Sequence, residues 1–182
     1  PVGHAFPYQC SQEVYDEIGK QMQAAVTASG ADRCSVNADV FVDGNKVSII
    51  EMGGRTGATC IPELISIYYG FDFYEKMLRS ALGETVEFNC AGKQPCMAKL
   101  LLSPAEGKIS HIDIEGIHRL EEKGVVVSLD FPVGHKVFAM ADGTDRIGHI
   151  IARTEEESQL DAWMMEAYRC IFIDGVSLED IW

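Results

Sequence analysis

The chain has 182 residues and a mass of 20.0 kDa, a size that suits one large domain or one domain with a small second one. Its 47% hydrophobic and 24% charged residues are ordinary for a soluble globular protein, and no apolar run approaches the roughly 20 residues of a membrane helix. The formal net charge of −13 argues against nucleic-acid binding, which depends on clustered Lys and Arg. We therefore expect neither a nucleic-acid nor a membrane partner.

The N-terminal part predicts an amphipathic helix. The chain begins at Pro1, without a methionine and in loop-like sequence, which suggests a fragment. Ser11 is expected to cap a helix over residues 11–29, and Gly30 is expected to end it. Apolar residues recur inside this range at helical spacing, and Glu13 lies in the first turn, where the helix dipole favours negative charge.

A β-hairpin with two acidic residues is predicted next. Residues 33–42 and 46–52 are rich in Val, Ile and Phe and flank a turn-forming Asp-Gly-Asn sequence. Each strand carries one acid, Asp39 or Glu51, and we expect both to be buried, which requires a neutralising cation. An odd-length loop would put the two acids on one face, and a three-residue loop would place them directly opposite each other. A loop of even length would separate them.

Glycines and an arginine follow this hairpin. Gly53, Gly54 and Gly57 are expected to break the strand and to let the backbone approach a ligand, with Arg55 between them. Two carboxylates beside an arginine are a natural seat for Mg²⁺ and the phosphates it carries. The alternatives are solvent-facing acids, a surface arginine and ordinary loop glycines that need a positive φ. Helices are predicted over residues 61–69 and 72–82, separated by Gly70.

The second half of the chain reads as short strands. We expect strands at residues 97–103 and 108–115 joined as a hairpin, and further strands at 125–131, 135–140 and 146–153. Thr154 and Glu157 fit a capping box for a helix to residue 170, and a strand follows at 171–173. The predicted fold class is α+β, with one domain at residues 1–88 and a small β-rich domain at 89–182.

Cysteine and histidine patterns point away from metal or disulfide scaffolds. The six cysteines contain no C-x-x-C pair, so a reduced cytoplasmic protein is expected, with a Cys90–Cys96 disulfide left open. No histidine has a partner at zinc-ligand spacing. Asp113, Glu115 and His118 are expected to be solvated strand residues rather than a second acidic cluster.

The stretch from Asp39 to Leu64 resembles the C-terminal half of the ATP-grasp superfamily. In that family a strand carries an acidic metal ligand, and the next strand ends in an acid followed by a short E-x-N-x-R-x-G-like run. The matching residues here are Glu51-Met52-Gly53-Gly54-Arg55-Thr56-Gly57, before a helix that opens near Pro62. Residues 69–73 look like the step between the two following helices. Residues 145–156 resemble a small β-rich domain that trails carboxylate–amine ligases and biotin carboxylase relatives.

The resemblance implies an ATP- and Mg²⁺-dependent ligase of the amino-acid-ligase or carbamoyl-phosphate-synthase-like type. Such enzymes convert a small-molecule carboxylate to an acyl phosphate, which an amine then attacks. By this resemblance Asp39 and Glu51 would hold Mg²⁺ and its nucleotide, and Arg55 would face the transferring phosphate or the substrate carboxylate. Gly53, Gly54 and Gly57 would leave room for substrate and offer backbone N–H groups to the bound cofactor.

Two departures from the family pattern leave alternatives open. The family's Asn, a further metal ligand, is replaced by Gly53. The family's N-terminal domain and its central subdomain are not in these residues. The central subdomain carries the lysines that hold ATP, so the chain alone is expected to be inactive. The alternatives are a non-catalytic module on a decayed scaffold, which binds a small carboxylate or forms a homodimer, and a β-rich binding domain unrelated to ATP. The last would require Asp39 and Glu51 to point apart.

Overall fold

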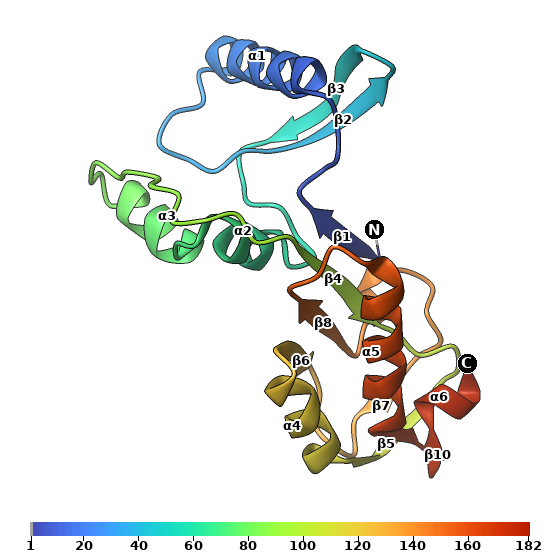
Figure 1. Cartoon of the computed structure of the whole chain (residues 1–182). Helices are drawn as coiled ribbons and strands as arrows, with labels where there is room; N and C mark the ends of the chain where they lie inside the picture. Colours follow the sequence, from blue (N-terminus) through green and yellow to red (C-terminus); the bar gives the residue numbers. More distant parts are fainter. Residues whose placement is uncertain (1) are drawn as a thin grey trace. The chain divides into compact units, whose positions relative to one another are not determined.

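A computed structural model describes residues 2–182, which form two compact units (Figure 1). The helix–hairpin unit comprises residues 7–93, and the sheet unit comprises residues 94–182 together with the N-terminal strand β1 (Gly3–Phe6). β1 joins the sheet unit because it pairs antiparallel with a strand that begins at Cys96. The expected division into domains 1–88 and 89–182 stays a prediction; the boundary between the compact units falls between Lys93 and Gln94.

The helix–hairpin unit contains the elements predicted for the first half of the chain. They are α1 (Gln12–Ser29), β2 (Asn37–Asp43), β3 (Lys46–Gly53), α2 (Ile61–Tyr69) and α3 (Phe73–Ala81). Ser11 caps α1 as expected, because its Oγ accepts a hydrogen bond from the Val14 N–H at 3.3 Å. Gly30 ends the helix in the left-handed conformation with φ of 69°.

The hairpin has a two-residue turn and carries a bulge. Asp43 pairs with Lys46, so the turn contains two residues rather than three. The register shifts further along the ladder, because Val40 pairs with Ile49 whereas the preceding Asp39 pairs with Glu51. Ile50 is the extra residue, and its side chain is 69% exposed. The sequence left the loop length open. A turn of even length alone would put Asp39 and Glu51 on opposite faces, and the bulge restores their direct pairing.

Helix α1 packs against β3 and covers one face of the hairpin. Val14 of α1 and Val47 of β3 are both buried. A hydrogen bond from Asn45 Nδ2 to Glu13 Oε2 at 2.9 Å ties the turn to the first turn of the helix. The side chains of Asp39 and Phe41 alternate with these core positions and are exposed.

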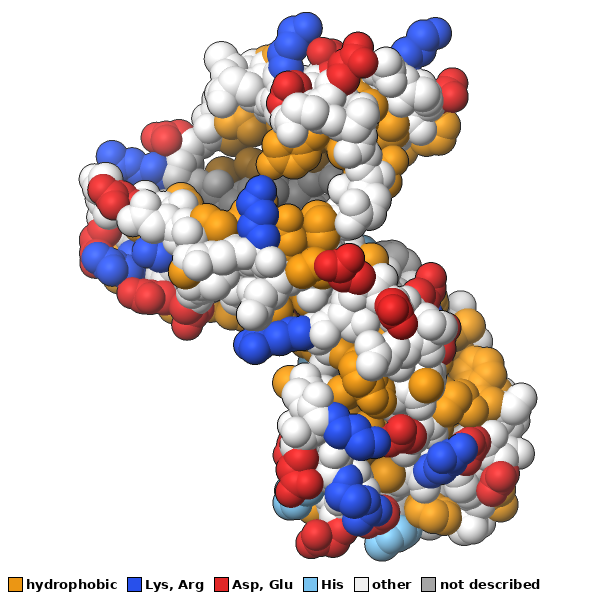
Figure 2. Space-filling view, viewed as in Figure 1, with side chains coloured by type: hydrophobic (Ala, Val, Ile, Leu, Met, Phe, Trp, Pro, Cys, Tyr) orange, Lys and Arg blue, Asp and Glu red, His pale blue; other side chains and the backbone are white. Residues whose placement is uncertain are grey.

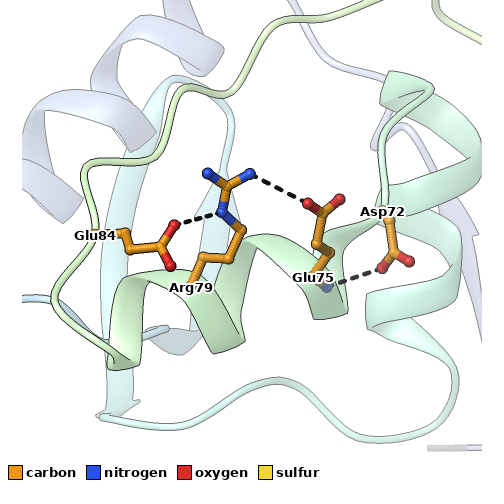
Figure 3. Close-up of polar contacts among 4 residues, drawn as sticks. All are labelled: Asp72, Glu75, Arg79 and Glu84. Atoms are coloured by element: carbon orange, nitrogen blue, oxygen red, sulfur yellow. Dashed lines mark hydrogen bonds and ion pairs between the residues drawn. The ribbon is translucent and has the colours of Figure 1, made fainter.

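Helices α2 and α3 form a short helical pair braced by polar contacts. Gly70 ends α2 with φ of 72°, and the Asp72 carboxylate caps α3 by accepting the Glu75 N–H at 3.0 Å. Arg79 donates to Glu75 at 3.2 Å and to Glu84 at 2.7 Å, which ties α3 to the segment that follows it (Figure 3). These glutamates raise the pKa of Arg79 further above its usual range, so the guanidinium is charged throughout the physiological range.

The sheet unit contains the main hydrophobic core of the chain. Its elements after β1 are β4 (Cys96–Leu101), β5 (Gly107–Ile112), α4 (Ile114–Glu122), β6 (Val125–Leu129), β7 (Lys136–Val137), the 3₁₀ turn η1 (Gly143–Asp145), β8 (Gly148–Ala152), α5 (Glu157–Arg169), β9 (Ile171–Ile173), β10 (Val176–Ser177) and α6 (Leu178–Ile181). The strands form two antiparallel sheets in the orders β1-β4-β8-β6 and β10-β9-β5-β7. Helix α5 packs against β4 and β9, and α4 packs against β6.

Three predictions for this half were wrong. β4 and β5 do not form a hairpin, because β4 pairs with β1 and β8 whereas β5 pairs with β7 and β9. The end of the strand predicted to reach residue 115 is helix α4 instead, and Asp113 caps it by accepting the Gly116 N–H at 3.0 Å. The predicted capping box is also absent: α5 begins at Glu157, and the Thr154 hydroxyl instead contacts Glu156 and Gln159.

The described residues thus form a mixed α+β structure with antiparallel sheets and six α-helices. Within residues 2–182 we find no helix with the length and apolar character needed to cross a membrane. Within residues 2–182 none of the six cysteines forms a disulfide, so the alternative of a Cys90–Cys96 bridge is excluded in this structure.

Candidate functional site

Asp39 and Glu51 lie directly opposite each other on the exposed face of the hairpin. Directly paired residues of an antiparallel ladder project to the same side, so the two carboxylates share one surface. Neither carboxylate has an ion-pair or hydrogen-bond partner among residues 2–182. The expectation that both acids are buried was wrong, because the bulge and the outward face leave them in solvent. Two like charges placed opposite each other are unfavourable without a cation between them.

Two carboxylates alone suit Mg²⁺ better than a metal ion whose ligands all come from the protein. In the described part of the chain, no group of three or more His, Cys, Asp or Glu side chains is placed to hold a metal ion. Mg²⁺ keeps several waters and is commonly held by one or two carboxylates together with substrate phosphates. Asp39 and Glu51 supply two carboxylates that no Lys or Arg of residues 2–182 neutralises. These are the ligands that a protein contributes to such a Mg²⁺ site.

Arg55 lies just beyond the carboxylate pair, in the turn after β3. Its Nη1 donates to the Thr56 carbonyl oxygen at 2.8 Å. The side chain folds back over Gly53, so that a Cβ on that glycine would lie 3.7 Å from Arg55 Cγ and 3.9 Å from Nε. Arg55 has no acidic partner among residues 2–182, which leaves N–H groups of its guanidinium for an anionic ligand.

The three predicted glycines have different roles in this turn. None of them has a positive φ, so the alternative that they are loop glycines required for left-handed backbone is wrong. At Gly57 a Cβ would lie 2.6 Å from Ile61 Cδ1 and 2.8 Å from Asn37 Oδ1, so any larger residue would force these side chains to shift. A Cβ at Gly54 would meet nothing within 4 Å. Close packing therefore explains Gly57, whereas Gly54 is open on its surface.

The backbone that leads from this turn into α2 is strained. Thr59 and Cys60 are consecutive non-glycine residues with φ of 53° and 65°. The left-handed region is a genuine outlier for a β-branched residue such as threonine, and each such residue costs on the order of 1–3 kcal/mol. Strain of this kind clusters at functional sites. No local sequence signal identifies it, since neither residue type favours this conformation.

A cleft of about 530 Å³ lies within the helix–hairpin unit. Its walls come from residues 33–37, from the turn of residues 55–57, and from α2, α3 and the segment after them. Figure 2 shows the hollow in this unit, with hydrophobic side chains on its walls and Lys or Arg side chains at its edge. Arg55 and Gly57 line the cleft, as do the basic residues Arg33 and Lys76, which the sequence reasoning missed.

The two helical walls of the cleft are joined by a hydrogen bond between α2 and α3. The Tyr74 hydroxyl donates to Glu63 Oε1 at 2.6 Å. This hydrogen bond, with partial burial and the charge of Glu63, raises the pKa of Tyr74 to about 12. Ser66 adds a second link, because its Oγ accepts the Phe73 N–H at 3.1 Å. Two hydrogen bonds therefore connect the α2 and α3 walls of the cleft.

Comparison with known proteins gives one similar sequence and many similar structures. No known protein-family profile matches the chain. An uncharacterized protein, y4rH of Sinorhizobium fredii (strain NBRC 101917 / NGR234), is 24% identical over 168 residues, which cover 91% of this chain and 35% of that protein. This level of identity establishes no family by itself.

The structural likeness is to ATP-grasp ligases. Phosphoribosylglycinamide synthetase from Anaerococcus prevotii matches with a TM-score of 0.80 and 24% identity, over 95% of this chain and 45% of that one. The L-amino acid ligase from Bacillus licheniformis matches with a TM-score of 0.70 and 19% identity, over 94% of this chain and 43% of that one. A third match is the biotin carboxylase domain of the Hydrogenobacter thermophilus 2-oxoglutarate carboxylase, in complex with MgADP, ADP and bicarbonate. Its TM-score is 0.69 and its identity is 15%, over 99% of this chain and 42% of that one.

The chain therefore has the fold of an ATP-grasp superfamily ligase, as the resemblance implied. It spans less than half the length of the solved structures it matches. The likeness establishes the fold, and the roles of the individual site residues stay predictions.

Proposed function

We propose that this chain forms part of an ATP-grasp carboxylate–amine ligase, in which it contributes the Mg²⁺-binding acids and a phosphate- or carboxylate-binding arginine. The proposal rests above all on Asp39 and Glu51, which face each other without a cationic partner at the position where the resemblance implies metal ligands. Similar solved structures include an L-amino acid ligase and a biotin carboxylase domain bound to MgADP. In the proposed arrangement the trailing sheet unit corresponds to the small domain that accompanies these ligases.

The proposed reaction joins a carboxylate and an amine at the expense of ATP. The substrate carboxylate oxygen takes the γ-phosphoryl group of ATP, which leaves ADP and an acyl phosphate. The amine nitrogen then attacks the acyl carbon, inorganic phosphate leaves, and the amine loses a proton. Bound Mg²⁺ supplies neutralisation of phosphate charge, which such phosphoryl transfer requires.

The residues of this chain act by binding and positioning. Asp39 and Glu51 hold the metal on the open face of the hairpin, where their shared negative charge is unfavourable without it. Arg55 follows Glu51 by four residues, and its side chain folds back over Gly53 at the end of β3. A planar guanidinium suits bidentate contact with a phosphate or a carboxylate. By itself the chain is proposed to be inactive, since it spans less than half of the matched enzymes.

A second candidate is a non-catalytic carboxylate-binding module on an altered ATP-grasp scaffold. Residue 53 is glycine where the family carries a metal-binding Asn, and no three-ligand metal group exists among residues 2–182. These observations favour a weaker metal site. The two candidates differ in one respect that can be measured, because only the ligase forms ADP in a carboxylate- and Mg²⁺-dependent reaction.

The deciding experiment measures ADP formation by the full-length protein with a panel of carboxylates and amines. Glu51→Gln and Arg55→Ala are each expected to lower turnover by about 100-fold or more, the scale for loss of one charged group at a phosphoryl-transfer site. Asp43→Asn is the matched control for loss of an acid, because Asp43 belongs to the same hairpin but lies opposite Lys46. Near-normal turnover in Glu51→Gln would overturn the catalytic assignment, and absence of any ADP from the unaltered protein would favour the binding module.

A further inference from the structure

The cleft of the helix–hairpin unit is lined by basic residues and, within residues 2–182, by no acidic ones. Arg33, Arg55 and Lys76 line it, and none of its lining residues is Asp or Glu. This is unexpected in a chain with 28 acidic and 15 basic residues. Arg33 lies 4.0 Å from Asp32 in an exposed pair, whereas Arg55 and Lys76 have no acidic partner among residues 2–182. The cleft therefore has the electrostatic character of a site for an anion.

The remaining walls of the cleft are largely apolar. They are formed by Ile61 and Ile65 of α2, Phe73, Met77 and Leu78 of α3, and Phe88 of the following segment. Leu78 is 66% exposed and Phe88 is 59% exposed, so apolar surface remains uncovered inside the concave site. Concave sites with apolar walls and a few placed polar groups are typical of small-molecule binding. An anion that fits this cleft would carry an apolar body.

The strand register places Asn37, which lines the cleft, on the same face of the hairpin as the carboxylate pair. Asn37 lines the cleft and lies two residues before Asp39 on β2, so the two side chains project to the same side. Asn37 pairs with Gly53, and Arg55 folds over that glycine. Asp39 and Glu51 themselves do not line the cleft. Arg55 is thus the residue that links the proposed metal site to the cleft.

We propose that this cleft binds a carboxylic acid with an apolar side chain, such as a hydrophobic amino acid or a branched short-chain acid. The carboxylate lies against Arg55, next to the acids that hold Mg²⁺, and the hydrocarbon part packs on the α2–α3 wall. Lys76 and Arg33 add positive potential at the rim. The assignment of this acid as the substrate rests on the proposed ligase function, whereas its binding in the cleft does not. A nucleotide is disfavoured here, because its metal-bound phosphates would lie at Asp39 and Glu51, outside the cleft.

The test compares direct binding of L-phenylalanine, L-leucine and 4-methylpentanoate with that of glycine and L-aspartate. Binding to the full-length protein is measured by calorimetry without ATP, so that it does not depend on turnover. The three apolar acids are expected to bind at least about 10-fold more tightly than glycine or aspartate, the scale for placing extra methylenes in an apolar pocket.

Two matched pairs of variants locate the binding site. Leu78→Gln alters an exposed leucine that lines the cleft, and Leu82→Gln alters one that is 80% exposed and does not line it. Lys76→Gln removes a cleft cation, and Lys93→Gln removes an exposed lysine elsewhere in the same unit. Leu78→Gln and Lys76→Gln are each expected to weaken binding of the apolar acids about 5- to 10-fold, without effect from the other two substitutions.

The outcomes separate this inference from the proposed function. If apolar acids bind and the cleft variants weaken them, the site is supported even where no ADP is formed. If the protein forms ADP with acids of every kind without preference for apolar ones, the cleft assignment is overturned while the ligase function stands. If Leu78→Gln and Leu82→Gln behave alike, or if Leu78→Gln weakens only ATP binding, the cleft is not the acid site.

Discussion

Asp39 lies directly opposite Glu51 across the β2–β3 hairpin, although the turn between the strands has only two residues. The bulge at Ile50 adds one residue to β3 and so brings the two acids into register. At the other end of the same strand, Asp43 lies opposite Lys46. The hairpin therefore carries one cross-strand pair of like charge and, next to the turn, one of opposite charge.

This arrangement predicts opposite effects of two conservative substitutions on stability. In the absence of divalent cations, Asp39→Asn should stabilise the protein by about 0.5 kcal/mol, because it removes a cross-strand repulsion. Asp43→Asn should destabilise it by a few tenths of a kcal/mol, because it removes an attraction. Urea denaturation in the presence of EDTA measures both free energies of unfolding. Equal effects of the same sign would show that the two acids of the site do not repel each other.

The glycines of the 53–57 turn should differ sharply in their tolerance of a methyl group. Gly57→Ala is expected to cost about 1–3 kcal/mol, because the new Cβ would overlap Ile61 and Asn37. Gly54→Ala should be nearly neutral, since a Cβ there meets nothing within 4 Å. Chemical denaturation of both variants compares them directly. A neutral Gly57→Ala would mean that the turn does not pack between β2 and α2.

The six thiols should react with a thiol reagent at two distinct rates. Cys10, Cys34 and Cys90 are exposed, whereas Cys60, Cys96 and Cys170 are buried. Burial also raises the pKa of Cys96 to about 11 and raises that of Cys170, which lowers their thiolate fraction. Titration of this chain with an aromatic disulfide at mildly alkaline pH should show three rapid equivalents and three more on denaturation. Rapid reaction of more than three thiols would contradict the burial of this second group.

The hydrogen bond between Tyr74 and Glu63 predicts a pH effect at high pH. The folded-state pKa of Tyr74, about 12, exceeds the usual value near 10, so the folded state holds this proton more tightly. Its contribution to stability is therefore complete below pH ~10 and is lost as the pH rises through about 12. The phenolate absorbance of the protein minus that of Tyr74→Phe isolates this titration. In Glu63→Gln the midpoint should fall toward 10, and an unchanged midpoint would mean that Glu63 does not raise the pKa of Tyr74.

Elements set by local chemistry were predictable from the sequence. Ser11 and Gly30 mark the ends of α1 because capping and left-handed glycine are properties of a few adjacent residues. The predicted hairpin of β4 and β5 was wrong, because the choice of strand partner depends on β1 and β8, which are distant in sequence. Helix α4 was not predicted, because Gly116 interrupts its helical pattern. Its N-cap, Asp113, lies inside the range predicted as a strand.

The candidate site also has residues that were predictable from the sequence and residues that were not. Asp39, Glu51, Arg55 and the neighbouring glycines were recognisable in the sequence because they lie close together along the chain. Their roles stay predictions. The structure places Asp39 and Glu51 on one face of the hairpin, and Arg55 in the turn that follows β3. Arg33 and Lys76 could not be connected with this site, because they come from segments that only the folded unit brings to the same cleft.

The sequence by itself determined which residue types are available to the site and where most helices and strands of the first half begin and end, since both depend on short-range patterns. Only the tertiary structure decided that Asp39 meets Glu51. Strand register depends on the sum of turn length and bulges, and a bulge at Ile50 leaves no distinct local signal. The same holds for the cleft, whose cations and apolar walls are assembled from segments up to 55 residues apart, from Arg33 to Phe88.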